Sequence, residues 1–185
     1  MKNLFAFLCL ITPLALYAQN NTFDEMKTEY GGRIKYADTE VQTLLSLYYI
    51  YPIKTGVRYS FNENKYYCCL MHSDGTITST VLITYDDLVK INKALDIIST
   101  EESSDIALGS KNLVNEFRTA SDLSFGYVVE PKNKSQIGSK LEAHWYIDFG
   151  QNTFKAPIYV YDGKLLVSSL KLIEDKLSEL NKISK

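Results

Sequence analysis

The chain has 185 residues, in which 20 lysine and arginine side chains stand against 22 aspartate and glutamate side chains, a formal net charge of −2 at pH 7. This mildly acidic balance, with scattered lysines, argues against a nucleic-acid binder. The length suits one domain with a sizeable core rather than two, and no linker rich in proline, glycine or serine divides the sequence. Residues 19–185 are therefore predicted to form a single domain.

The first eighteen residues have the pattern of a secretory signal peptide. Lys2 precedes an apolar run over residues 4–16, and Ala18 is the small residue expected before a cleavage point. The run is too short, and too interrupted by Thr12 and Pro13, for a membrane span of about 20 residues. We therefore expect an exported protein, periplasmic or secreted, with no transmembrane segment in the mature chain.

The end of this signal sequence also hints at a source. Its Ala18-Gln19 ending resembles those of exported proteins in the Gram-negative Bacteroidetes. The resemblance implies a compartment and not a function.

Residues 39–50 fit two kinds of secondary structure. Leu44, Leu45 and Tyr48 fall on one face of a helix, whereas the leucine, tyrosine and isoleucine content before Pro52 also suits a strand. We favour the helix here.

A meander of strands is predicted next. Alternating apolar residues indicate a strand over residues 57–61, a turn at residues 62–64 and a second strand over residues 65–71. The second strand is apolar on both faces, which indicates a central position in a sheet. The Asp74-Gly75 pair favours a tight turn into a third strand over residues 77–85.

An amphipathic helix follows this meander. Asp86 or Asp87 is expected to cap it, and the acidic, serine-rich run 100–105 is expected to end it after residues 87–98. Its apolar side recurs at three-four-three spacing and consists of Leu88, Ile91, Leu95 and Ile98. The helix needs a sheet to cover.

The second half repeats this order loosely. Strands are predicted over residues 125–129, 145–149 and 154–161, and a terminal helix over residues 165–182. The apolar stripe of that helix is narrow, suits a sheet or a partner helix, and consists of Leu166, Leu170, Ile173, Leu177 and Leu180.

The predicted fold class is α+β, an antiparallel meandering sheet of roughly six to eight strands packed by two helices, residues 87–98 and 165–182. Tyr85-Asp86 and Tyr161-Asp162 both stand where a strand gives way to a helix. Two loosely repeated halves, each of three strands and a helix, are a further hypothesis.

Cysteine and histidine supply the weak catalytic candidates. Once Cys9 leaves with the signal peptide, Cys68 and Cys69 are the remaining cysteines, and His72 and His144 are the only histidines. Neighbouring strand residues point to opposite faces, so a bond between the two sulfurs would distort the peptide, and two small half-buried side chains are expected. A strained vicinal disulfide, an intermolecular bridge, or a thiol enzyme that uses one cysteine with one histidine are the alternatives.

No metal site and no cofactor is predicted. His72 with Asp74 is the nearest approach to a ligand pair, and two ligands at one turn do not make a site.

Tyrosine is the most unusual component, with 14 residues. Tyrosine suits a half-exposed sheet, and it also suits a recognition surface because it supplies contact area at low entropic cost. On the strand around Trp145, alternate polar residues share one face, which is either solvated or faces a ligand. The candidate residues for binding a ligand or partner are Tyr59, Tyr127, His144, Tyr146, Asp148 and Tyr159.

From these patterns we expect a non-enzymatic binding or interaction protein of the bacterial envelope or extracellular space, whose partner is an unknown protein or small ligand. A small Cys/His-dependent hydrolase or thiol enzyme is the alternative. A structural subunit of an envelope assembly, held by the stripe of the terminal helix, is the third hypothesis.

Overall fold

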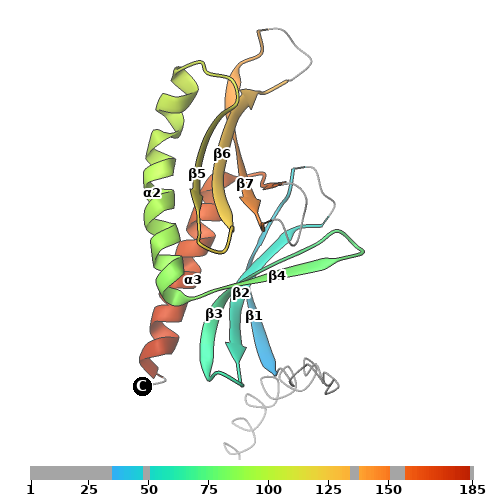
Figure 1. Ribbon diagram of the computed structural model, residues 1–185, viewed down its shortest axis with the longest axis vertical. Helices are drawn as coiled ribbons and strands as arrows, with labels where there is room; N and C mark the ends of the chain where they lie inside the picture. The colour runs from blue at the N-terminus through green and yellow to red at the C-terminus, as the bar shows by residue number, and fades with distance from the viewer. Residues whose placement is uncertain (1–34, 48–50, 134–137, 151–156, 184–185) are drawn as a thin grey trace, which may run out of the picture.

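The structure is a computed structural model that describes residues 35–47, 51–133, 138–150 and 157–183. The described residues form eight strands and two helices (Figure 1). This confirms the α+β class and the two predicted helices. The predicted signal peptide lies outside the described residues.

The strands form two antiparallel four-stranded sheets. In each sheet, strands that follow one another in the sequence are hydrogen-bonded neighbours. The first sheet contains β1 (Tyr36–Leu44), β2 (Ile53–Ser60), β3 (Lys65–Ser73) and β4 (Thr78–Ile83). The second sheet contains β5 (Leu113–Arg118), β6 (Ser124–Pro131), β7 (Leu141–Asp148) and β8 (Ile158–Tyr159).

A short stretch of pairing joins the two sheets. Ser46 forms a bridge with Val160, the Leu47 amide donates to the Tyr159 carbonyl at 3.0 Å, and the Tyr161 amide donates to the Leu45 carbonyl at 2.8 Å. The continuation of β1 therefore lies beside β8. The meander that the sequence predicts is thus two sheets linked edge to edge.

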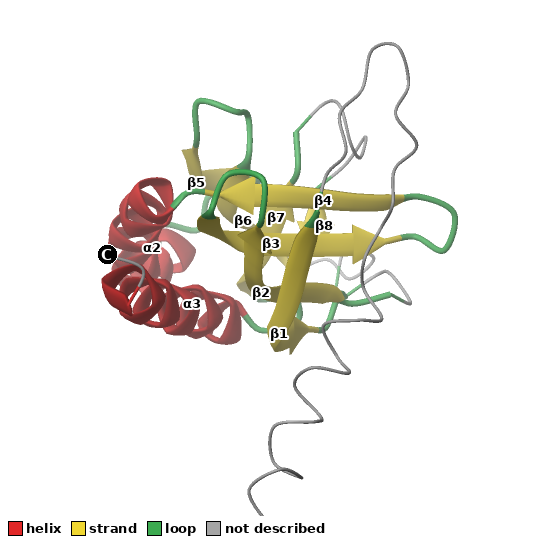
Figure 2. Ribbon diagram, turned by 90° about the horizontal axis from the view of Figure 1, so that it is seen from below, coloured by secondary structure: helices red, strands yellow, loops and turns green. Residues whose placement is uncertain are grey.

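Both helices, α2 (Tyr85–Ala107) and α3 (Gly163–Ile183), lie on the same side of the strands (Figure 2). Between them, the Asn92 side-chain amide donates to the Leu170 carbonyl at 3.2 Å and to the Glu174 carboxylate at 2.6 Å. Their buried stripes agree with the predicted ones and consist of Leu88, Ile91, Leu95 and Ile98 in α2 and Leu166, Leu170, Ile173 and Leu177 in α3. None of the helices in the described part of the chain is long and apolar enough to span a membrane.

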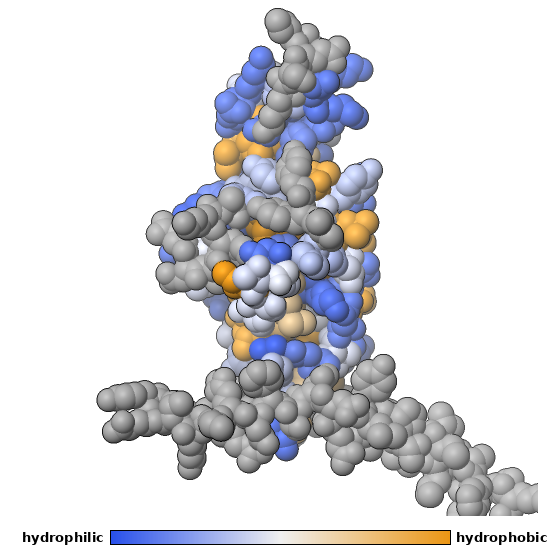
Figure 3. All heavy atoms as spheres, turned by 90° about the vertical axis from the view of Figure 1, so that its right-hand side faces the viewer, coloured by the Kyte–Doolittle hydropathy of each residue, from blue (hydrophilic) through white to orange (hydrophobic). Residues whose placement is uncertain are grey.

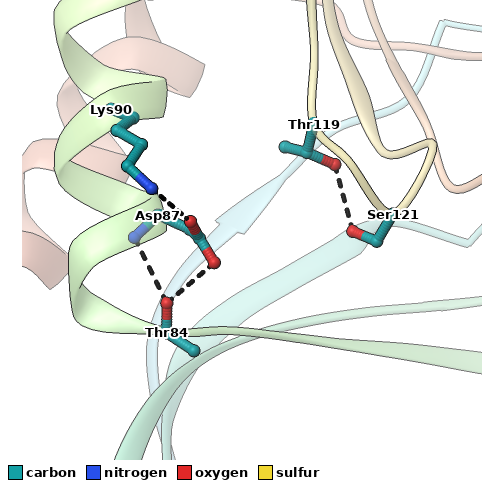
Figure 4. Close-up of polar contacts among 5 residues, drawn as sticks. All are labelled: Thr84, Asp87, Lys90, Thr119 and Ser121. Carbon is teal, nitrogen blue, oxygen red and sulfur yellow. Dashed lines mark hydrogen bonds and ion pairs between the residues drawn. The ribbon is translucent and has the colours of Figure 1, made fainter.

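The start of α2 differs from the prediction. Thr84 is the N-cap, because its hydroxyl oxygen accepts from the Asp87 amide at 3.2 Å. Asp87 accepts from the Thr84 hydroxyl and from Lys90 at 2.9 and 3.0 Å (Figure 4). This reciprocal arrangement resembles a capping box, so Asp87 stands in the first turn instead of at the cap.

The end of α2 also differs, since the helix runs to Ala107 instead of Ile98. Two contacts hold this extra length on the second sheet. The Glu102 carboxylate accepts from the Trp145 indole at 3.0 Å, and the Asp105 carboxylate accepts from the Tyr127 hydroxyl at 2.8 Å. These tertiary bonds override the weak helix preference of a serine-rich run.

The predicted helix over residues 39–50 is wrong where the structure describes it. β1 occupies Tyr36–Leu44 and pairs with β2, with Leu44 opposite Ile53 and both side chains buried. The local pattern fitted both structures, and pairing with β2 decided between them. Residues 48–50 lie outside the described ranges.

The two halves each consist of four strands followed by a helix, which is consistent with a loose repeat. The prediction had three strands in each half. In the structure, β1 and β5 are the additional first strands of the two halves.

His72 lies on the face of β3 that turns toward the core, opposite Ile53 and Ser79, and is 1% exposed. Burial lowers the pKa of His72 below its ordinary value of 6.5, and a hydrogen bond to the Pro52 carbonyl and the charge of Asp74 oppose this shift. The folded protein therefore favours the neutral ring.

We expect His72 to make the fold less stable in mild acid. The unfolded chain binds the proton more readily, so the free energy of unfolding is highest above the ordinary pKa of about 6.5 and falls as the pH drops through it. Urea unfolding of the wild type and of His72→Met from about pH 7.5 to pH 5.5 measures this, and the variant should lose less stability. Equal losses would contradict the expectation.

Candidate functional site

The structure does not assemble a thiol–histidine pair. Cys68 and His72 are four residues apart on the inward face of β3, a separation of roughly 13 Å along a strand. Cys69 points to the opposite face, and His144 lies on β7 of the other sheet. Hydrogen-bond reach needs about 3 Å.

Both thiols are free and buried. Burial raises the pKa of Cys69 to about 12, although the nearby Arg58 charge lowers it, and burial raises the pKa of Cys68 further. Little thiolate is therefore present at neutral pH, which is the form that a nucleophile requires.

We expect the native thiols to resist alkylation. Iodoacetamide at about pH 8 should leave Cys68 and Cys69 unmodified in the folded protein and label both after denaturation, as intact mass reports. Rapid labelling of Cys69 in the folded protein would contradict the burial of both thiols.

β7 divides its side chains between two environments, as predicted. His144, Tyr146 and Asp148 point away from the helices, whereas Trp145 and Ile147 point into the core. Three of the predicted binding residues thus share one face.

This outward face is held by a small polar and aromatic network. The Tyr146 hydroxyl donates to the Glu116 carboxylate at 2.6 Å, and Arg118 donates to the other oxygen of Glu116 at 2.9 Å. The Tyr159 ring lies 5.9 Å from the Tyr146 ring and 6.5 Å from the His144 ring, edge to face in both cases. Burial, followed by the bond to Glu116, raises the pKa of Tyr146.

The other two predicted tyrosines lie elsewhere. Tyr127 is in the core, where its hydroxyl donates to Asp105 at 2.8 Å and its ring lies 5.1 Å from the Trp145 ring. Tyr59 is in the first sheet, with its ring 4.7 Å from the Tyr66 ring. Tyr59, Tyr127, Tyr146 and Tyr159 therefore do not form one patch.

The region where the sheets join exposes apolar side chains that the sequence reasoning missed. Leu45 is 63% exposed, Tyr161 is 73% exposed and Leu47 is 37% exposed. They fall on the same outward side as Tyr159, because Val160, between Tyr159 and Tyr161, points inward and is buried. We call this surface the junction face, which consists of Leu45, Leu47, Tyr159 and Tyr161, and the buried rings of Tyr146 and His144 pack against Tyr159 beneath it.

A cleft of about 600 Å³ opens beside the junction face, where β8 ends. β8 pairs with β7 at Tyr146 and Ile147, and the Val160 amide adds one bond to the Trp145 carbonyl at 2.9 Å. The chain then turns into α3, whose first amides donate to the Asp162 carboxylate. The cleft is lined by Leu47, Glu102, Ile106, Lys132, Glu142, Ala143, His144, Trp145, Val160, Tyr161, Asp162, Gly163 and Lys164, and we call it the β7 cleft.

Gly163 allows α3 to begin against the indole of Trp145. A β-carbon at this position would lie 2.3 Å from the Trp145 ring. The indole is buried and hydrogen-bonded to Glu102, so it cannot move aside easily. Glycine is therefore required by the close approach of the helix.

His144 stands where the junction face meets the β7 cleft. Its Nε2 atom is buried, lies 3.5 Å from a Glu142 oxygen and has no hydrogen-bond partner among the described residues. The other oxygen of Glu142 lies 3.7 Å from the Lys132 ammonium group. This ring nitrogen retains capacity for a further hydrogen bond.

Two further hollows lie at other places. One of about 710 Å³ lies between the start of β3, the start of α2 and the end of α3, and includes Tyr66, Tyr67 and Tyr85. Another of about 500 Å³ separates Lys90 on α2 from the β5–β6 turn, where Thr119 and Ser121 bond to each other (Figure 4). Within the described ranges, no three histidine, cysteine or acidic side chains gather in a way that could hold a metal ion.

No protein-family model matches the sequence, and no curated protein matches it. The site therefore has to be interpreted from its own geometry.

We expect Gly163→Ala to destabilise the protein by about 1–3 kcal/mol, because the added methyl group overpacks against Trp145. Helix propensity alone predicts the opposite sign, a gain of up to about 1 kcal/mol. Ser168→Ala, at an exposed position of the same helix, is the control. Denaturant unfolding measures both, and a stabilised Gly163→Ala would show that α3 does not rest on the indole.

Proposed function

We propose that this chain is a non-enzymatic binding protein of the bacterial envelope or extracellular space that holds another protein at the junction face. The observation that carries the proposal is the group of exposed apolar side chains at the seam between the sheets. Leu45 and Tyr161 are opposite each other across this seam and are 63% and 73% exposed. Apolar side chains exposed together, beside polar ones, are typical of interaction surfaces.

The side of the molecule that Figure 3 presents is mixed in character, because apolar patches lie between hydrophilic side chains. The described residues therefore do not present one uniformly apolar face there, and an interface would be a local patch with a polar rim, as in complexes of soluble partners.

Rigidity of the aromatic residues supports recognition at this surface. Tyr146 is fixed by Glu116, and Tyr159 packs edge to face against Tyr146 and His144. A tyrosine that is already ordered loses little side-chain entropy when a partner binds.

The assembly hypothesis has less support. It rested on the apolar stripe of α3, and Leu166, Leu170, Ile173 and Leu177 of that stripe are buried against the rest of the chain. They are therefore already used within the fold. The enzymatic alternative needs a cysteine beside a histidine, and the strand positions keep them apart.

Native mass spectrometry of the exported protein, purified gently from cells that produce it, tests the proposal. We expect a second polypeptide mass with the wild type and its loss with the double variant Leu45→Ser, Tyr161→Ser. The control is Leu172→Ser, which removes a similarly exposed apolar side chain, 52% exposed, from α3.

A bare monomer with the wild type would contradict the proposal. Retention of the partner by the double variant would contradict the location of the site. Loss of the partner from Leu172→Ser as well would point to a general effect on solubility, and the junction face would then have no special role.

A further inference from the structure

Among the described residues, one edge of β7 has a neighbouring strand over only half of its length. β6 pairs with β7 from Asp148 back to Leu141, so that side of the strand is covered throughout. On the other side, β8 and Val160 reach only as far back as Trp145. Among the described residues, Leu141–His144 therefore have a neighbouring strand on one side alone.

Two hydrogen bonds fix the direction in which the backbone of this segment points. The Lys132 amide donates to the Lys140 carbonyl at 2.8 Å, so even-numbered residues of β7 turn their peptide groups toward β6. The Val160 amide donates to the Trp145 carbonyl at 2.9 Å, so odd-numbered residues turn theirs toward β8. Beyond the end of β8, the N–H and C=O groups of Ala143 and Leu141 consequently point away from β6, and those of Ala143 point toward the β7 cleft.

The β7 cleft has the form that an additional strand requires. It is about 600 Å³ in volume, and Glu142, Ala143 and His144 line it over roughly 10 Å of strand. Its core side is formed by Trp145 with Ile106 and Glu102 of α2, and its outward side by His144 and Tyr161. A strand placed there would send alternate side chains to these two sides.

The charged side chains that line the β7 cleft indicate which side chains an added strand would carry. Its lining contains three carboxylates, Glu102, Glu142 and Asp162, and two ammonium groups, those of Lys132 and Lys164. Glu142, like His144, points to the outward side of β7, where the basic side chains of an added strand would lie. An apolar side chain with basic neighbours therefore complements the cleft better than one with acidic neighbours.

We infer that the protein binds an extended segment of another polypeptide, with alternating apolar and basic side chains, as an additional strand on the free edge of β7. This inference rests on the proposed function and specifies the partner. The segment continues the position of β8, takes main-chain hydrogen bonds from Ala143 and Leu141, and places its apolar side chains toward Trp145 and Ile106. Main-chain bonds to a sheet edge supply the affinity in such complexes, and side-chain pockets supply the specificity.

Fluorescence anisotropy with labelled synthetic hexapeptides tests the inference on the full exported chain. The probes alternate valine with lysine, valine with glutamate, or serine with lysine, and a fourth is the valine–lysine peptide N-methylated at alternate residues. We expect saturable binding of the valine–lysine peptide and at least about tenfold weaker binding of the other three. N-methylation removes the donors that a β-ladder needs and leaves the side chains in place.

Ala143→Pro is the matching change in the protein. The N–H of Ala143 points toward the cleft and not toward β6. Proline at this position should therefore remove the hydrogen bond to the added strand and leave the pairing of β7 with β6 intact. The control is Thr80→Pro on the edge strand β4, where the bond from the Asp74 amide to the Ile77 carbonyl places the Thr80 N–H on the side away from β3. We expect about tenfold weaker peptide binding by Ala143→Pro and unchanged binding by Thr80→Pro, with circular dichroism of both variants matching the wild type.

The inference is overturned by absence of valine–lysine binding, or by binding that neither Ala143→Pro nor N-methylation weakens. If Ala143→Pro fails to fold, the N-methylated peptide alone decides. These outcomes are separable from the proposed function, because Leu45 belongs to the junction face and does not line the β7 cleft. A native partner that the single variant Leu45→Ser loses is bound at the junction face, whatever the peptides show. Conversely, a Leu45→Ser variant that loses the native partner and still binds the valine–lysine peptide would show that the junction face and the edge of β7 bind independently.

Discussion

The contact between Gly163 and the Trp145 indole decides how the second sheet ends. Because α3 begins directly against this ring, the chain leaves the sheet after Val160, and β8 remains short. This early end of β8 has three consequences at the edge of β7. The early end of β8 leaves Leu141–His144 without a neighbour on that side among the described residues, opens the β7 cleft and leaves Tyr161 exposed beside Leu45. The surface that we propose for binding therefore arises from a packing constraint in the core.

A second set of contacts ties the two sheets to one pair of helices. Glu102 and Asp105, in the last turns of α2, accept hydrogen bonds from Trp145 and Tyr127 of the second sheet. The first part of the same helix buries Leu88 and Ile91 in the shared core. The apolar first part of α2 thus packs in the shared core, and its polar last turns bind the second sheet. The indole of Trp145 takes part in both this bond and the contact with Gly163, so the helices and the cleft are coupled through one side chain.

Much of the fold could be predicted because its pattern is local. The stripes of α2 and α3, the meander from β2 to β4 and the two faces of β7 follow from spacing alone. What could not be predicted depends on partners distant in the sequence. Residues 39–44 fit a helix or a strand until β2 pairs with them, and the serine-rich end of α2 becomes helical because the second sheet holds it. Likewise, Tyr127 and Tyr146 are both buried tyrosines, and only their positions along β6 and β7 assign Tyr127 to the core cluster and Tyr146 to the face with Glu116. The alternation of Leu45 and Leu47 in an extended chain was the signal that could have revealed the junction face.

The account of function depends most directly on the free edge of β7, and amide hydrogen exchange measured by NMR on the protein without a partner tests it at single residues. If the edge is open, the amides of Leu141 and Ala143 exchange quickly, whereas those of Glu142 and His144, which face β6, are protected. This alternation within one strand is the predicted result, since it reports which peptide groups a neighbouring strand covers. Uniform protection from Leu141 to His144 would mean that another part of the molecule already occupies the edge, and strand addition at the β7 cleft would then be excluded.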